Sequence, residues 1–242
     1  MSTDYSHIDV GGIPIEIRRK AIKNLHVGVY PPDGQVRVSA PIHIDDSAVR
    51  LAIVSRIPWI KKKRDGFLEQ SRQSPREMVT GESHYFAGQR YRLSVVEHPG
   101  SPRVRIIGTS KLELKVPLGT DASKRKEILE RWYRCQLKTQ ISESLSHWEP
   151  QVGITVPDCR VKRMKTLWGS CNPIARRIWL NLELAKKDRV CLEYVLVHEM
   201  MHFFERAHNN RFRELMDFYM PDWRLRRDQL NAAPLANEVW GY

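Results

Sequence analysis

The stretch of sequence that decides the fold is Val190–Arg206, which reads Val-Cys-Leu-Glu-Tyr-Val-Leu-Val-His-Glu-Met-Met-His-Phe-Phe-Glu-Arg. It contains no Pro or Gly, and its apolar residues recur at helical spacing, so we predict one buried helix. Residues four apart lie on one face of a helix. His198 and His202 can therefore offer ring nitrogens to one metal ion. In His-Glu-x-x-His sites the residue after the first ligand, here Glu199, has its carboxylate beside the metal-bound water.

A catalytic zinc ion takes three protein ligands and leaves one position open. His208 is a candidate third ligand, because it follows His198 by the same number of residues as the third histidine in His-Glu-x-x-His-x-x-Gly-x-x-His enzymes. Glu205 stands where that pattern has Gly, but the segment Ala207-His208-Asn209-Asn210 could still break the helix, since Asn tolerates left-handed backbone. Glu205 is a rival ligand, because it follows His202 by three residues on the same helical face.

A different interpretation makes these histidines ordinary hydrogen-bonded core residues. However, a charged Glu199 inside an apolar helix is costly to bury without a partner, and a metal centre explains both histidines and the glutamate together. Zinc lowers the pKa of a bound water to about 7, and a neighbouring carboxylate can then accept its proton. We therefore expect a zinc cofactor with Glu199 as the general base.

Composition limits the class of protein. The chain has 242 residues, a net charge of +12 and an isoelectric point near 9.7, which favours anionic partners such as nucleotides or nucleic acid, although a basic surface can also serve solubility alone. We predict no membrane span, because the sequence has no run of 18 apolar residues, and the N-terminus lacks a signal-peptide pattern. The four cysteines form no Cys-x-x-Cys pair. We expect a cytoplasmic protein with reduced thiols and no membrane contact.

The fold class predicted from these patterns is α+β. Short segments bounded by Gly, Pro and Ser predict an N-terminal strand-rich part, residues 1–120, with one helical segment over 45–72 that Pro58 divides. Residues 59–64, Trp-Ile-Lys-Lys-Lys-Arg, form either a solvated helix face or a polyanion contact. The predicted strands are 13–19, 25–30, 35–40, 84–87, 90–97, 103–107 and 112–116.

A long helix over 121–148 opens the second part, residues 121–242, a zinc-metallopeptidase-like domain that carries the metal helix; the sequence does not decide whether the two parts are independent domains. Further helices are predicted over 210–219 and from Pro221 onward. The predicted strands of this part are 154–156, 161–164 and 177–182.

Trp168-Gly169-Ser170 interrupts the strand pattern shortly before the metal helix. These residues could form a substrate-binding edge, because the main chain of an edge strand can bind an extended peptide by strand addition. They could equally form a tight packing corner.

Several of these segments together resemble the YgjP-like metallopeptidase-domain family, a bacterial relative of the SprT-like and other gluzincin-type zinc proteins. They are Met-Lys-Thr-Leu-Trp-Gly-Ser-Cys at 164–171, Ile-Trp-Leu-Asn at 178–181, Val-His-Glu-Met-Met-His at 197–202, His208 with Arg211-Phe212, and Tyr-Met-Pro-Asp-Trp at 219–223. The resemblance implies an N-terminal β-rich part and a C-terminal zincin-like α+β domain, with His198, His202 and His208 as zinc ligands and Glu199 as base.

One position departs from the family pattern. Leu167 stands where the family usually has Arg directly before Trp-Gly-Ser. If that Arg contacts substrate, this protein differs in substrate or rate. Arg163 or Lys165 could replace it only if the local strand is regular, because alternate residues of a strand share a face.

Three functions fit this sequence. The first is a zinc metallopeptidase, in which Glu199 activates the water that attacks a peptide carbonyl. The second is a UTP pyrophosphatase that uses the same metal site, since members of the resembled family are also described in this way and the chain is basic. The third is a DNA-associated protein in which zinc supports a scaffold. The metal helix favours hydrolysis over plain binding, and its mechanics favour a peptide substrate.

Overall fold

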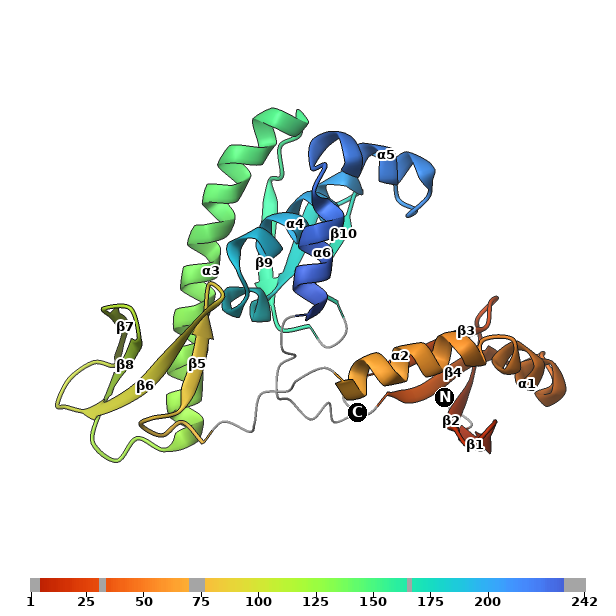
Figure 1. The fold of residues 1–242 in the computed structure, drawn as a ribbon, viewed down its shortest axis with the longest axis horizontal. Helices are drawn as coiled ribbons and strands as arrows, with labels where there is room; N and C mark the ends of the chain where they lie inside the picture. The colour runs from red at the N-terminus through yellow and green to blue at the C-terminus, as the bar shows by residue number, and fades with distance from the viewer. Residues whose placement is uncertain (1–4, 31–33, 70–76, 165–166, 233–242) are drawn as a thin grey trace. The chain divides into compact units, whose positions relative to one another are not determined.

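The computed structural model describes residues 5–30, 34–69, 77–164 and 167–232 (Figure 1). The chain is mixed α+β, with a β-rich N-terminal part and mainly helices towards the C-terminus, as the sequence predicts. It forms two compact units, one within residues 1–73 and one within 74–236. The division therefore lies near residue 73 and not near residue 120. The reason is that strands before residue 120 and the long helix after it share one hydrophobic core.

The first unit is a four-stranded sheet with two helices. The order of its strands is β1-β2-β4-β3, with β2 and β4 parallel. Its buried residues come from alternate positions of β2 and β4 and from one face of each helix, among them Ile15, Val38, Ile53 and Ile60. The elements are β1 Tyr5–Asp9, β2 Pro14–Lys20, β3 His26–Tyr30, β4 Gln35–Pro41, α1 Asp46–Val54 and α2 Ile57–Glu69. The sequence did not predict β1, which reads Tyr-Ser-His-Ile-Asp and is largely exposed.

The second unit begins with a sheet that packs against the long helix α3, Ala122–Val152. Its strand order is β5-β6-β8-β7, with β6 and β8 parallel. Leu112, Leu114 and Val116 of β8 are buried in the core that also contains Leu129 of α3. The strands are β5 Ser83–Phe86, β6 Gln89–Glu97, β7 Arg103–Ile107 and β8 Lys111–Val116. The backbone amide of Ala87 donates to the carbonyl of Ala185, so the turn after β5 also touches the segment before the metal helix.

A smaller sheet of order β10-β11-β9 follows α3. Its strands are β9 Asp158–Lys162, β10 Gly169–Asn172 and β11 Arg177–Asn181, and β10 lies at an edge, antiparallel to β11. The strand predicted over 154–156 is wrong. The helix before it ends at Gly153 in left-handed conformation, and the Val156 amide then donates to the Glu149 carboxylate at 2.7 Å.

The metal helix, α4, runs from Arg189 to Met201 and is capped by Asp188, whose carboxylate accepts from the amide of Val190. Buried residues lie on more than one side of this helix, so most of it is enclosed in the core. The remaining elements are the 3-10 helix η1 Leu182–Lys186, α5 Asn210–Tyr219 and α6 Trp223–Ala232. All four cysteines are free thiols. No helix among the described residues is long and apolar enough to cross a membrane.

Candidate active site

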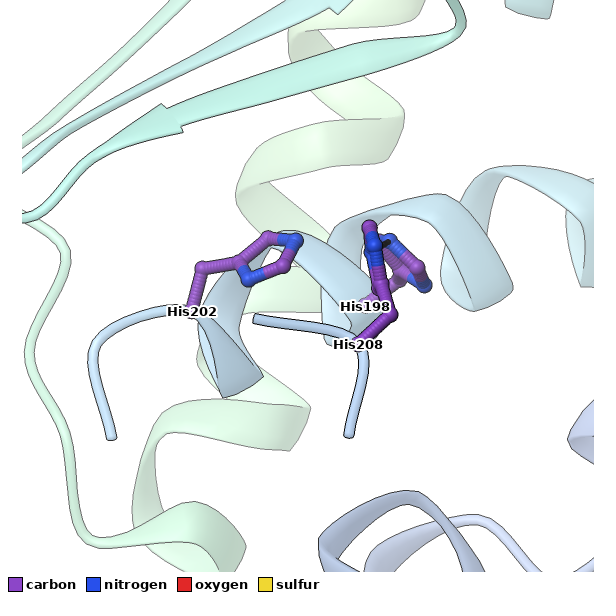
Figure 2. A group of neighbouring side chains, drawn as sticks. All are labelled: His198, His202 and His208. Carbon is purple, nitrogen blue, oxygen red and sulfur yellow. Dashed lines mark hydrogen bonds between the residues drawn. The ribbon is translucent and has the colours of Figure 1, made fainter. Parts of the chain in front are cut away.

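Three histidines converge at the C-terminal end of α4 (Figure 2). His198 lies within the helix, His202 is its C-cap with helical dihedral angles, and His208 comes from the turn that follows. The distances between ring centroids are 5.1 Å for His198 and His202, 4.9 Å for His198 and His208, and 4.8 Å for His202 and His208. One nitrogen of each ring lies within 4.8 Å of the others. The structure thus brings together the three residues that the sequence nominated as metal ligands.

The turn that returns His208 to the helix is held by its own polar side chains. The sequence predicts a helix that continues to Arg206, but α4 ends at Met201, five residues earlier. The Glu205 carboxylate accepts from the Ala207 amide at 3.0 Å, and the Asn209 side chain accepts from the Phe212 amide at 3.0 Å to begin α5. Glu205 therefore stabilises the turn and lies outside the histidine cluster.

Phe212 of α5 packs against the cluster from one side. Its ring centroid lies 4.9 Å from that of His198 and 4.8 Å from those of both His202 and His208. Phe212 is itself buried. An apolar ring in contact with all three imidazoles fixes their orientation and excludes water from that side, which is the kind of support that metal ligands need.

Two of the histidines are held in the neutral form that binds metal. Burial, together with the neighbouring His202 and His208, lowers the pKa of His198 to about 3, and burial also lowers the pKa of His208. The Nδ1 of His202 lies 3.0 Å from the carbonyl oxygen of Glu205, to which it can donate, and this leaves the Nε2 lone pair free for a ligand bond. Three imidazoles match the ligand set of a zinc site.

His198 lacks the partners that a structural core histidine would have. Its Nδ1 is buried and has no hydrogen-bond partner among the described residues, and its Nε2 meets another imidazole, the Nε2 of His208, at 2.9 Å. Buried polar atoms are nearly always hydrogen-bonded. The cluster therefore fits a metal-binding site better than it fits hydrogen-bonded core residues.

Glu199 is buried against the edge strand β10. Only 6% of its surface is exposed, and burial raises the pKa of its carboxyl to about 8. A Cβ atom on Gly169 would lie 2.6 Å from Oε1 and 2.8 Å from Cγ of Glu199, so a side chain at this position would occupy the space that the carboxylate fills. Gly169 of Trp-Gly-Ser thus serves as a packing position, and its partner is the nominated general base.

Comparison with known proteins identifies the family. A family model described as YgjP-like, metallopeptidase domain, matches residues 24–233. The chain belongs to the YgjP-like family. Among solved structures, the crystal structure of the metallopeptidase zymogen of Pyrococcus abyssi abylysin is similar at 19% identity, with 41% of this chain and 99% of that chain covered and a TM-score of 0.36. No curated protein matches the chain. Membership in the YgjP-like family supports a metal-dependent hydrolase.

Asn181 organises the segment before β10 in this YgjP-like chain. It is 5% exposed, and its side-chain amide donates to the carbonyls of Met164 at 3.0 Å and Leu167 at 2.8 Å. Its Oδ1 accepts from the amides of Met164 at 3.3 Å and Glu183 at 3.2 Å, and its own backbone amide donates to Trp168 at 2.9 Å. In the sequence, Asn181 belongs to the family motif at 178–181, but a buried hydrogen-bonding role is indicated only by its being one amide at the end of an apolar strand.

The position that departs from the family pattern lies on the surface. Leu167 is 56% exposed, and Arg163 is held by the Glu130 carboxylate at 2.8 Å. Lys165, the other residue that could replace the family Arg, lies outside the described residues. The neighbouring Trp168 ring faces a cation instead, because the Nζ of Lys187 lies 5.5 Å from its centroid.

Proposed function

We propose that this protein is a zinc-dependent peptidase in which His198, His202 and His208 hold the metal ion and Glu199 is the general base. The observation that carries the proposal is the convergence of three imidazoles at the end of a helix whose buried carboxylate, Glu199, is next in sequence to the first of them. Zinc bound there would supply a Lewis acid that polarises the scissile carbonyl and makes a water molecule more acidic.

Glu199 has the surroundings that a proton acceptor needs. Glu199 is buried, and its side chain fills the space beside Gly169 that Val195 also borders, with Oε1 and Val195 Cγ1 at 2.6 and 2.9 Å from the position of a Cβ at residue 169. In this apolar setting the carboxyl holds a proton more readily than in water, as the raised pKa shows. Glu199 would take the proton of the attacking water and deliver it to the leaving amine.

The edge strand supports a peptide as the substrate. In the described part of the sheet, β10 pairs with β11 on one side only. An extended chain could add to its other side through main-chain hydrogen bonds. Because Gly169 of β10 touches Glu199, a peptide aligned on this strand would pass close to the general base.

Nucleotide hydrolysis is the alternative that the chain's net charge of +12 favours. The discriminating experiment removes metal with a chelator, restores one equivalent of zinc, and then follows cleavage of an unfolded protein such as reduced casein beside pyrophosphate release from UTP. The proposal predicts zinc-dependent cleavage of the protein and no pyrophosphate release. Pyrophosphate release without protein cleavage would assign the same site to nucleotides and overturn the peptidase.

A further inference from the structure

The sheet β5-β6-β8-β7 has one apolar face and one basic face. Along β6, Tyr91 and Leu93 are buried while Arg90 and Arg92 are exposed, and along β8 the buried Leu112 and Leu114 alternate with charged residues. The same alternation on β7 turns Val104 and Ile106 towards the core. Every lysine and arginine between positions 83 and 116 consequently lies on the other face, which we call the basic face: Arg90, Arg92, Arg103, Arg105, Lys111 and Lys115.

The strand register places these cations side by side. Arg92 lies opposite Lys111, and Arg103 lies opposite Lys115. Side chains on one face recur every ~6.6 Å along a strand and every ~4.8 Å across strands. The six cations therefore form one continuous positive field and not a set of isolated charges.

Few carboxylates neutralise this field. The segment contains two acidic residues. Glu97 is in register with the core-facing positions of β6, and its carboxylate lies 3.5 Å from Arg125 of α3. Glu113 is on the basic face, where it accepts from Arg105 at 2.7 Å and lies 3.9 Å from Lys115. Six positive charges against this one negative charge leave the basic face with a net charge of +5.

The composition of the basic face selects among polyanions. Four of its six cations are Arg, whose planar guanidinium matches phosphate oxygens in pairs. Protein segments that bind lipid surfaces combine cations with apolar side chains that insert into the membrane. Among the strands β5 to β8, Ile107, at 37%, is the one large hydrophobic residue that is more than a third exposed.

We propose that the basic face binds nucleic acid through the phosphate backbone, without dependence on base sequence. It is a binding surface separate in sequence from the histidine cluster, and it does not depend on the peptidase assignment. A repeating phosphate chain fits a field that spans several strands, because each cation that meets a phosphate releases a counterion.

Fluorescence anisotropy with a 20-base-pair duplex DNA tests this proposal on the full-length protein over 50 to 300 mM salt. The test variant carries Arg90→Gln, Arg103→Gln and Lys111→Gln; within the described structure these three exposed residues make no ion pair, so the fold should be retained. The matched control carries Lys20→Gln, Lys23→Gln and Arg50→Gln, three exposed residues of the first unit, which removes the same charge elsewhere.

The expected result for the test variant is about 30-fold weaker binding at 50 mM salt and a salt slope smaller by about 3. The control should bind within about threefold of wild type. Equal losses in the two variants would overturn the proposal, because net charge alone would then explain binding. Absence of DNA binding at 50 mM salt, or binding to anionic vesicles alone, would also overturn it. If the triple variant fails to fold, the single variant Arg103→Gln should still lower the slope by about 1.

Discussion

Replacing Gly169 by Ala would add a methyl group in the space that the Glu199 carboxylate occupies. The new Cβ would lie 2.6 Å from Oε1 of Glu199, whereas ordinary contacts begin at 3.4 Å, so the carboxylate must move by about 0.8 Å. It cannot move freely, because Val195 Cγ1 lies 2.9 Å from the same point and Glu199 is buried. The backbone of β10 does not oppose the change, since Gly169 is not in the left-handed region.

Two consequences of different size follow from this displacement. Overpacking a core costs about 1–3 kcal/mol of unfolding free energy, which urea unfolding measures. A general base displaced by nearly 1 Å costs on the order of 100-fold in rate, which kcat/KM of the zinc-loaded protein measures on whichever substrate the wild type cleaves. Zinc affinity, measured by competition with a chelating dye, should stay within about twofold, because no histidine is touched.

Ser170→Ala is the matched control, because it changes the neighbouring residue of the same strand without adding volume. It should keep at least half of the wild-type rate. The reasoning is refuted if Gly169→Ala retains the wild-type rate, since Glu199 would then not need its place against β10. Parallel loss of zinc and activity would also contradict it, because the whole site would then have been disrupted.

Three further predictions concern the same unit. Asn181→Ala removes four side-chain hydrogen bonds of a buried amide and should lower the unfolding free energy by about 3 kcal/mol in urea titrations; an unchanged midpoint would contradict its organising role. His208→Ala should weaken zinc binding at least about 100-fold, and Glu205→Ala less than about tenfold; the reverse order would make the glutamate the third ligand. Burial lowers the pKa of Lys187 from 10.5 to about 8, so its burial penalty is present below pH 8 and disappears as pH rises towards 10.5. The free energy of unfolding of wild type relative to Lys187→Met should therefore increase between pH 7 and pH 9.5, and a constant difference would contradict the shift.

The elements that the sequence predicted well are those specified by local pattern. The helix that carries His198 follows from apolar periodicity, and α5 has the predicted bounds, Asn210–Tyr219, because Asn209 is a strong N-cap. The grouping of the three histidines follows from spacing along one helix and one turn. These features depend on residues within a few positions of one another.

The features that the sequence did not predict depend on contacts between distant residues. The unit boundary near residue 73 results from packing of β5–β8 on α3, which no local pattern reports. The need for glycine at position 169 comes from the Glu199 side chain, which lies 30 residues later in the sequence. The end of α4 at Met201 depends on the turn that Glu205 and Asn209 stabilise, so helical periodicity alone extended it too far.

The most direct test of the central claim is hydrolysis by Glu199→Gln protein whose zinc content has been measured. The substitution keeps the size of the side chain and removes its ability to accept a proton. The account predicts one zinc ion per chain in both proteins and a rate at least about 1,000-fold lower in the variant. A variant that binds zinc and retains the wild-type rate would contradict the account, because Glu199 would then have no part in the reaction.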